Sequence, residues 1–294
     1  MSILIAVLVI AVIGGSIYWL RNDRFVIDSV NVSGASFSNP TQVQSVAMGD
    51  LAGNYLFVYP KASIYFYKAK KIEADILRDF PAVQTLTLSL QKNPASQAPM
   101  LAITVKERQP FALWCGESIG SSAAAPALSA SSSDSAAVDS SDSSDTSGQC
   151  YFADSSGYIF SEAPHFSGTL YPIFYGGLGE ASSSPTGTTT QVIGNSILTP
   201  SRLASVMDFA KNVGPIGFNV TSYAITEDPS GDICDLYYGT STSSYLRIDC
   251  DGDFSDMATN LQAFITDSHF SSSTPFGYQY IDLRFGDKIV YKRK

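Results

Sequence analysis

Charged residues are scarce in this 294-residue chain, since Asp, Glu, Lys and Arg make up 15% of it, against about 25% in an average soluble domain. This scarcity excludes a charge-rich disordered protein and a long surface-type coiled coil. Lys and Arg number 18 and Asp and Glu 27, which gives a formal net charge of −9. Nucleic-acid binding needs a basic surface that neutralises phosphates, so we expect no nucleic-acid partner.

Residues for catalysis or cofactor binding are also few. The two histidines, His165 and His269, lie in loop-like stretches without a nucleophile motif such as G-x-S-x-G. No glycine-rich phosphate loop is present. An acidic run from Asp249 to Asp256 places Gly252 at position four, whereas a calcium-binding EF-hand needs glycine at position six. We therefore expect no metal, no cofactor and no enzymatic activity, and interpret the acidic run as a turn leading into a helix.

The chain has four cysteines. Cys234 and Cys250 flank a segment that alternates and turns through residues 241–244, and a hairpin folded about residue 242 brings them opposite one another. Cys115 and Cys150 lie on either side of a polar segment, the Ser/Ala/Asp-rich stretch described below. A bridge across the hairpin stabilises by about 3 kcal/mol and persists only in an oxidising compartment. The alternative is four free buried cysteines, because pairing cannot be deduced from sequence alone.

Residues 3–20 are apolar and free of charge, and about 18 residues are near the minimum that crosses a bilayer. We expect residues 1–24 to form a transmembrane anchor that leaves the rest extracytoplasmic. Arg21 and Arg24 follow the segment, so the charge bias alone favours the opposite orientation, but the cysteines argue for export. A cleaved signal peptide with small residues at Gly14, Gly15 and Ser16 is the alternative.

The remaining pattern predicts an α+β fold. Residues 25–114 read as strand, helix, helix, strand, strand, with Asn39 capping a helix that starts at Pro40. Residues 115–150 are a Ser/Ala/Asp-rich insert too polar to fold. Residues 151–294 predict a mostly antiparallel sheet with two helices, ending in strands around Gly286.

Three stretches resemble the FtsQ/DivIB bacterial cell-division proteins. Residues 25–114 include Glu-Arg-x-Pro-x-Ala-x-Trp at 107–114 and are similar to that family's polypeptide-transport-associated (POTRA) domain, whose elements run in the same order. Residues 154–160 resemble the start of the family's β domain, and residues 280–291, with Asp-Leu-Arg-Phe at 282–285, resemble its last strands. The acidic insert and the missing basic cytoplasmic tail depart from the family.

The resemblance implies a non-catalytic, single-pass scaffold of the bacterial plasma membrane, located at the division site. The end of its β domain would pair with an FtsB/DivIC-like partner by strand addition, helped by the basic residues 292–294. The alternative functions are a secreted or anchored cell-envelope enzyme and an adhesin. For the last strands, the alternative is that Leu283 and Phe285 are core residues instead of partner contacts. The positions that match the partner-binding strand are Arg284, Phe285, Lys288, Ile289, Val290 and Tyr291.

Overall fold

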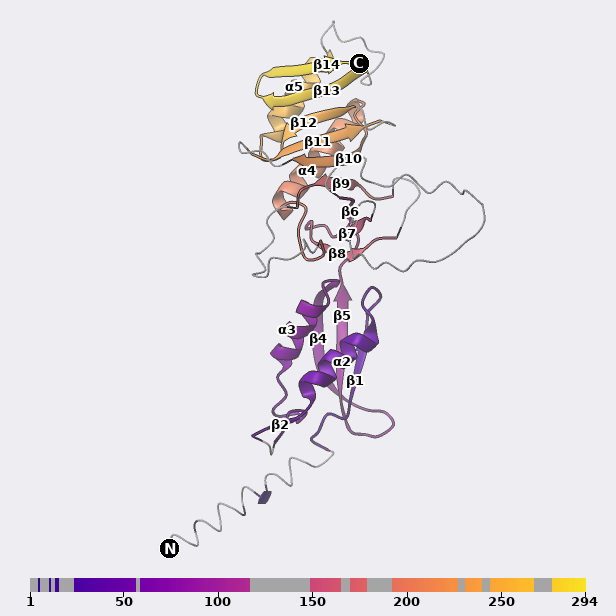
Figure 1. Cartoon of the computed structure of the whole chain (residues 1–294), viewed down its shortest axis with the longest axis vertical. Coiled ribbons are helices and arrows are strands. Elements are labelled where there is room, and N and C mark those ends of the chain that lie inside the picture. The colour runs from indigo at the N-terminus through magenta and orange to yellow at the C-terminus, as the bar shows by residue number, and fades with distance from the viewer. Residues whose placement is uncertain are drawn as a thin grey trace, which may run out of the picture. The chain divides into compact units, whose positions relative to one another are not determined.

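The computed structural model (Figure 1) divides the chain into two compact units, residues 1–108 and residues 109–294. It describes residues 5, 11, 14, 15, 24–56, 59–116, 149–164, 170–178, 192–226, 231–239, 244–266 and 277–294. Residues 117–148 of the insert, the two histidines and most of the segment expected to form the anchor therefore lie outside the described residues.

Unit 1 has a three-stranded sheet in the order β1-β5-β4 with a small separate hairpin. β1 runs parallel to β5, and β4 runs antiparallel to it. The order strand, helix, helix, strand, strand agrees with the sequence pattern, and the hairpin β2–β3 is an addition to it. The elements are β1 (Ser29–Ser33), α2 (Pro40–Leu51), β2 (Asn54–Tyr55), β3 (Tyr59–Pro60), α3 (Ala69–Asp79), β4 (Val83–Lys92) and β5 (Pro99–Glu107).

Local sequence explains these elements. The Asn39 side chain accepts a hydrogen bond from the Thr41 N–H, which caps α2 as predicted. Val43 in α2 and Ile76 in α3 are fully buried in the core of unit 1. The β5 strand contributes buried apolar residues to the same core, and these alternate with exposed Thr104 and Lys106. The two helices thus cover one face of the sheet and leave the other face to solvent.

Glu107, the acidic residue of the Glu-Arg-x-Pro string, ties the end of β5 to the segment before α2. Its buried carboxylate accepts hydrogen bonds of 2.7 to 2.8 Å from the N–H and hydroxyl of Ser36 and from the N–H groups of Phe37 and Ser38. Burial alone raises the pKa of Glu107, but these four bonds together bring it below its ordinary value of 4.5. Gly34 allows the approach, because its φ is +86° and a Cβ there would lie 2.2 Å from the Val105 carbonyl oxygen.

Replacing Glu107 with glutamine is expected to lower the free energy of unfolding of unit 1 by about 2 kcal/mol, because charge-assisted bonds become neutral ones. The depressed folded-state pKa adds stability that is present above the unfolded pKa and is lost as pH falls through the folded pKa. Urea unfolding at pH 7 and pH 3 checks this. The difference between wild type and variant should shrink at pH 3, and equal stability at pH 7 would show that the carboxylate is not holding the segment.

Unit 2 is built on a nine-stranded mixed sheet in the order β14-β13-β12-β11-β10-β9-β6-β7-β8. Five neighbouring pairs are antiparallel, and β12–β13, β9–β10 and β6–β9 are parallel. The elements are β6 (Ala112–Trp114), β7 (Tyr151–Ala153), β8 (Ile159–Glu162), β9 (Ile173–Gly176), α4 (Pro200–Val213), the 3-10 turn η1 (Gly214–Ile216), β10 (Val220–Thr226), β11 (Ile233–Tyr238), β12 (Tyr245–Asp249), α5 (Phe254–Thr266), β13 (Tyr278–Phe285) and β14 (Lys288–Arg293).

Both helices of unit 2 pack on one face of this sheet (Figure 1). Phe209 of α4 and Phe254 of α5 contact each other at 5.8 Å between ring centroids, and the buried face of each helix joins one continuous core. The opposite face of the sheet carries no helix among the described residues. β6, which the sequence pattern places at the end of the first domain, pairs with β7 and β9 of unit 2.

The chain is α+β, as its pattern predicts, but the expected transmembrane helix is wrong. In the part of the chain that the structure describes, no helix is long and apolar enough to cross a membrane. The longest described helix, α4, has 14 residues and includes Arg202 and Lys211. At 1.5 Å per residue it spans about 21 Å, short of a hydrocarbon core of about 30 Å.

Candidate functional site

The most distinctive feature of unit 2 is the open edge formed by β14. Within the described residues, β14 pairs with β13 and with no other strand. The Lys294 N–H donates to the Gly277 carbonyl on the β13 side. Backbone groups alternate in direction along a strand, so the N–H groups of Ile289, Tyr291 and Arg293 point away from the sheet. These outward groups are available to a further strand.

The opposite edge of the same sheet is formed by β8, and part of it has a backbone partner. Residues 194–197 of the chain itself lie beside the start of β8. Ile159 donates its N–H to the Asn195 carbonyl and accepts from the Gly194 N–H, and Tyr158 bridges to Ser196. The β8 edge is therefore covered by the chain at its start, whereas β14 has no strand on its outer side in the described structure.

The β13–β14 hairpin is held firmly in spite of its position at the edge. Ile281 and Leu283 of β13 are buried in the core beneath α5. Asn260 of α5 donates its side-chain N–H to the carbonyl of Gly286 in the turn, at 2.8 Å. Gly286 adopts φ +62°, a conformation that glycine takes readily. The edge is thus presented in one fixed arrangement, which reduces the ordering cost of binding.

Six sequence-predicted site residues lie together on this hairpin. Arg284 is paired with the buried Asp282 carboxylate through two hydrogen bonds of 3.0 and 2.8 Å, which raise the pKa of the guanidinium. Its guanidinium also lies 5.4 Å from the ring centroid of Phe285, which is 52% exposed. Ile289 is half-buried against the core. The remaining three, Lys288, Val290 and Tyr291, are exposed.

On the helix side, the edge has an aromatic cluster. The Tyr291 ring contacts Phe264 of α5 at 5.2 Å and Tyr278 of β13 at 5.3 Å between centroids. The guanidinium of Arg293 lies 5.9 Å from the Tyr278 ring centroid. Tyr291 nevertheless remains 45% exposed. Apolar side chains of an added strand would extend this cluster.

On the helix-free side, a row of tyrosines runs in register toward the edge. Tyr237 of β11 opposes Tyr245 of β12, which opposes Tyr280 of β13, which opposes Lys292 of β14. Neighbouring ring centroids lie 5.1 and 5.9 Å apart. Burial, together with the Asp235 carboxylate, raises the pKa of Tyr237 to about 12, so its hydroxyl stays protonated at neutral pH.

A row of paired charges runs beside the tyrosines. Asp235 of β11 accepts two hydrogen bonds of 2.7 Å from Arg247 of β12, and Arg247 opposes Asp282 of β13 in the register. Hydrogen bonding to Asp235 raises the pKa of the Arg247 guanidinium. Both rows were missed by sequence reasoning, although alternating Tyr and charged residues in three strands were the signal for them. Together they fix the register of the strands that lead to the edge.

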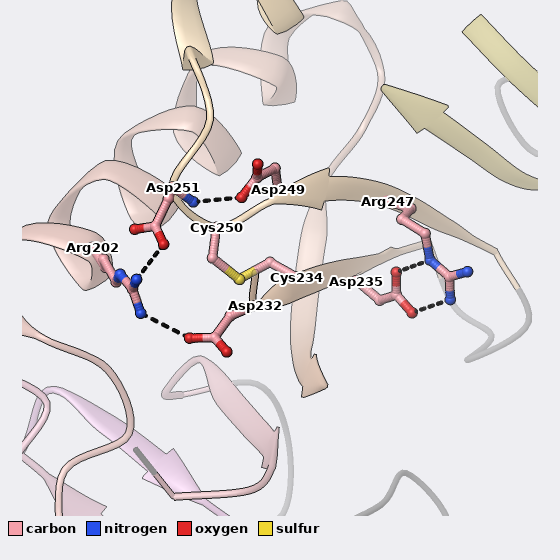
Figure 2. The surroundings of a disulfide bond; sticks show 8 residues. All are labelled: Arg202, Asp232, Cys234, Asp235, Arg247, Asp249, Cys250 and Asp251. Carbon is pink, nitrogen blue, oxygen red and sulfur yellow. Dashed lines mark hydrogen bonds and ion pairs between the residues drawn. A yellow bond between two sulfur atoms is a disulfide. The ribbon is translucent and has the colours of Figure 1, made fainter. Parts of the chain in front are cut away.

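Both expected cysteine pairs form disulfides, Cys115–Cys150 and Cys234–Cys250. The second lies between the ends of β11 and β12, near the ion pair of Arg202 with Asp232 (Figure 2). The strands differ in register from the expected hairpin, because Cys234 opposes Ile248 rather than Cys250. The bridge is therefore diagonal, with the two Cα atoms 5.4 Å apart.

The acidic run after β12 has structural partners. Asp253 accepts the N–H groups of Ser255 and Asp256 at the start of α5, at 2.9 and 3.1 Å. Asp249 accepts the Asp251 N–H, and Asp251 also pairs with Arg202. Among the described residues, no group of three or more His, Cys, Asp or Glu is placed to hold a metal ion.

Comparison with known protein families finds none that matches this chain. Comparison with curated proteins likewise finds no significant relative.

Proposed function

We propose that this chain is a non-catalytic binding protein of the bacterial cell-division complex, which holds a partner by adding that partner's strand to β14. The observation that carries the proposal is the β14 edge, which pairs only with β13 among the described residues, in a sheet whose opposite edge strand has a backbone partner at its start. The resemblance of residues 280–291 to the last strands of FtsQ/DivIB proteins supports the same conclusion, and an FtsB/DivIC-like protein is then the partner.

The two faces of β14 define what the partner strand should carry. Lys288 and Lys292 lie on the helix-free side, whereas Ile289 and Tyr291 lie on the helix side next to Phe264. A complementary strand therefore alternates carboxylates with apolar residues. The four basic residues of this edge, Lys288, Lys292, Arg293 and Lys294, favour an acidic partner strand over the β14 edge of another copy, because two basic edges repel each other.

The disulfides bear on where the protein works. Disulfides persist in oxidising compartments and are rare in the cytosol. The two bridges thus support an extracytoplasmic location for unit 2.

In dividing cells, a fluorescently tagged chain should be enriched at midcell, and a diffuse distribution would count against a division role.

Replacing Phe285 with aspartate is expected to abolish pull-down of the FtsB/DivIC-like protein, because the change places a charge among groups that the partner contacts. The thermal midpoint should stay nearly unchanged, since the Phe285 ring is 52% exposed. Leu90→Asp is the matched control: Leu90 lies on β4 of unit 1 and is 42% exposed. A lower midpoint would identify Phe285 as a core residue, and unchanged pull-down would remove it from the interface.

A further inference from the structure

A second surface, in unit 1, has a composition unlike the rest of the acidic chain. No Asp or Glu occurs between Asp50 and Glu73, while four lysines do, at positions 61, 68, 70 and 71. Six aromatic residues fall within positions 55–67 of the same stretch. Local positive charge combined with tyrosine-rich aromatics is a composition typical of membrane–water interfaces.

The hairpin β2–β3 holds an apolar side chain out into solvent. Leu56 follows β2 directly and is 82% exposed, the most exposed of the large hydrophobic residues that the structure describes. Its backbone has φ +49°, a left-handed conformation that leucine rarely adopts. The hairpin is tied at its base by the Lys61 N–H, which donates to the Gly53 carbonyl. An exposed leucine on a strained turn needs a reason other than packing within the unit.

Two further exposed rings lie on the segment after β3. Tyr65 and Phe66 are 57% and 46% exposed. The Phe66 ring lies 6.1 Å from Tyr59 of the hairpin, and the Tyr65 ring lies 5.9 Å from Phe25, both measured between centroids. Leu56, Tyr59, Tyr65 and Phe66, with Lys61 and Lys68, are called the hairpin patch below.

The charges of the patch are positive and face aromatic rings. The ammonium nitrogens of Lys61 and Lys68 lie 6.0 and 5.3 Å from the ring centroid of Tyr55, and neither forms an ion pair with a carboxylate of the described residues. Lys71 behaves differently, because it forms ion pairs with Asp50 and Asp75. The two patch lysines therefore keep their charge available for an anionic surface.

The patch is fixed to the core from beneath. Ser63 is fully buried and bridges to Val26, and the Ile64 N–H donates to the Phe25 carbonyl. Ile64 and Tyr67 pack against the core of unit 1, while the two residues between them point outward. Local packing thus presents the exposed rings in a defined way instead of leaving them in a loose loop.

We infer that the hairpin patch docks on the surface of an anionic lipid bilayer. Positive charge without carboxylates complements anionic headgroups, tyrosines favour the headgroup level, and Leu56 enters the acyl boundary. A few apolar side chains on a small hairpin suit shallow insertion better than a protein interface, which buries about 800 Å² on each partner. The inference is independent of β14 and goes beyond the proposed partner binding.

Hydrogen exchange of the full chain tests this inference locally. Bulk sedimentation with vesicles would also report adsorption of the apolar residues 3–20, so the readout is exchange at residues 53–56 and 61–68. With phosphatidylglycerol/phosphatidylcholine vesicles, exchange there should slow at least about threefold, and with phosphatidylcholine alone it should not. Equal slowing with both kinds of vesicle overturns the inference. No slowing with either kind also overturns it and would indicate that the patch binds a protein instead of a membrane.

A variant pair sharpens the test. Leu56→Asp should remove the slowing, and aspartate tolerates the left-handed conformation better than leucine, so the hairpin should survive. Leu90→Asp places the same charge at an exposed leucine of β4 and should keep the slowing. Loss of the slowing in both variants, or in neither, contradicts a role for the patch.

Discussion

Replacing Tyr291 with proline is expected to weaken binding of a strand-adding partner at least about tenfold while leaving unit 2 folded. The Tyr291 N–H points outward, so proline removes a donor that the partner needs and puts its ring in the path of the incoming strand. Proline is tolerated in edge strands where the missing N–H faces solvent. Affinity for the FtsB/DivIC-like protein is measured by titration, with the thermal midpoint measured alongside it.

Two neighbouring variants separate backbone from side-chain effects. Tyr291→Ala removes the ring but keeps the N–H, so it should retain more affinity than the proline variant. Val290→Pro removes an N–H that points toward β13 and should instead destabilise the hairpin. If Tyr291→Pro and Tyr291→Ala weaken binding equally, the ring carries the affinity and strand addition at this position is wrong.

Removing the Cys234–Cys250 disulfide by changing both cysteines to alanine is expected to lower the free energy of unfolding of unit 2 by about 3 kcal/mol. The bridge closes a loop with a sequence separation of 16, and loop entropy gives this magnitude. Both cysteines are 1% exposed, so the smaller alanines also leave space in the core. Urea unfolding of the oxidised wild type and the variant measures the difference.

The other disulfide provides a comparison for this prediction. Cys115–Cys150 has a sequence separation of 35, for which loop entropy gives about 4 kcal/mol. Changing those two cysteines to alanine should therefore cost at least as much. An unchanged urea midpoint for both double variants would mean that neither bridge stabilises the fold, and would weaken the case for an oxidising compartment.

Much of the fold follows from local pattern. The Asn39–Pro40 signal places the start of α2 correctly, because a cap and a fixed φ act on neighbouring residues. Helix periodicity was a less reliable guide to the start of α3. Ile64 continues the apolar stripe of Ile72 and Ile76 at multiples of four residues, yet the helix begins at Ala69. The Ile64 N–H donates to the Phe25 carbonyl instead of joining the helix. At this position, a hydrogen bond to a residue distant in sequence outweighed the local helix periodicity.

Long-range pairing could not be read from the sequence. Leu113 of β6 looks like the end of the first domain, but it pairs in parallel with Ile173, sixty residues later (173 − 113 = 60). The cysteine hairpin was predicted with the right disulfide pair but two residues out of register, since Cys234 opposes Ile248 rather than Cys250. The six predicted site residues lie on one hairpin, and their role in partner binding stays a prediction. The tyrosine row is visible only once three strands are aligned.

Hydrogen exchange of β14 in the complex with the FtsB/DivIC-like protein tests strand addition most directly. The outward amides of Ile289, Tyr291 and Arg293 should exchange at least about tenfold more slowly in the complex, because each gains a partner carbonyl. The inward amides of Val290 and Lys292 already bond to β13 and should change less. Slowing elsewhere on unit 2 with the three outward amides unchanged would contradict the account.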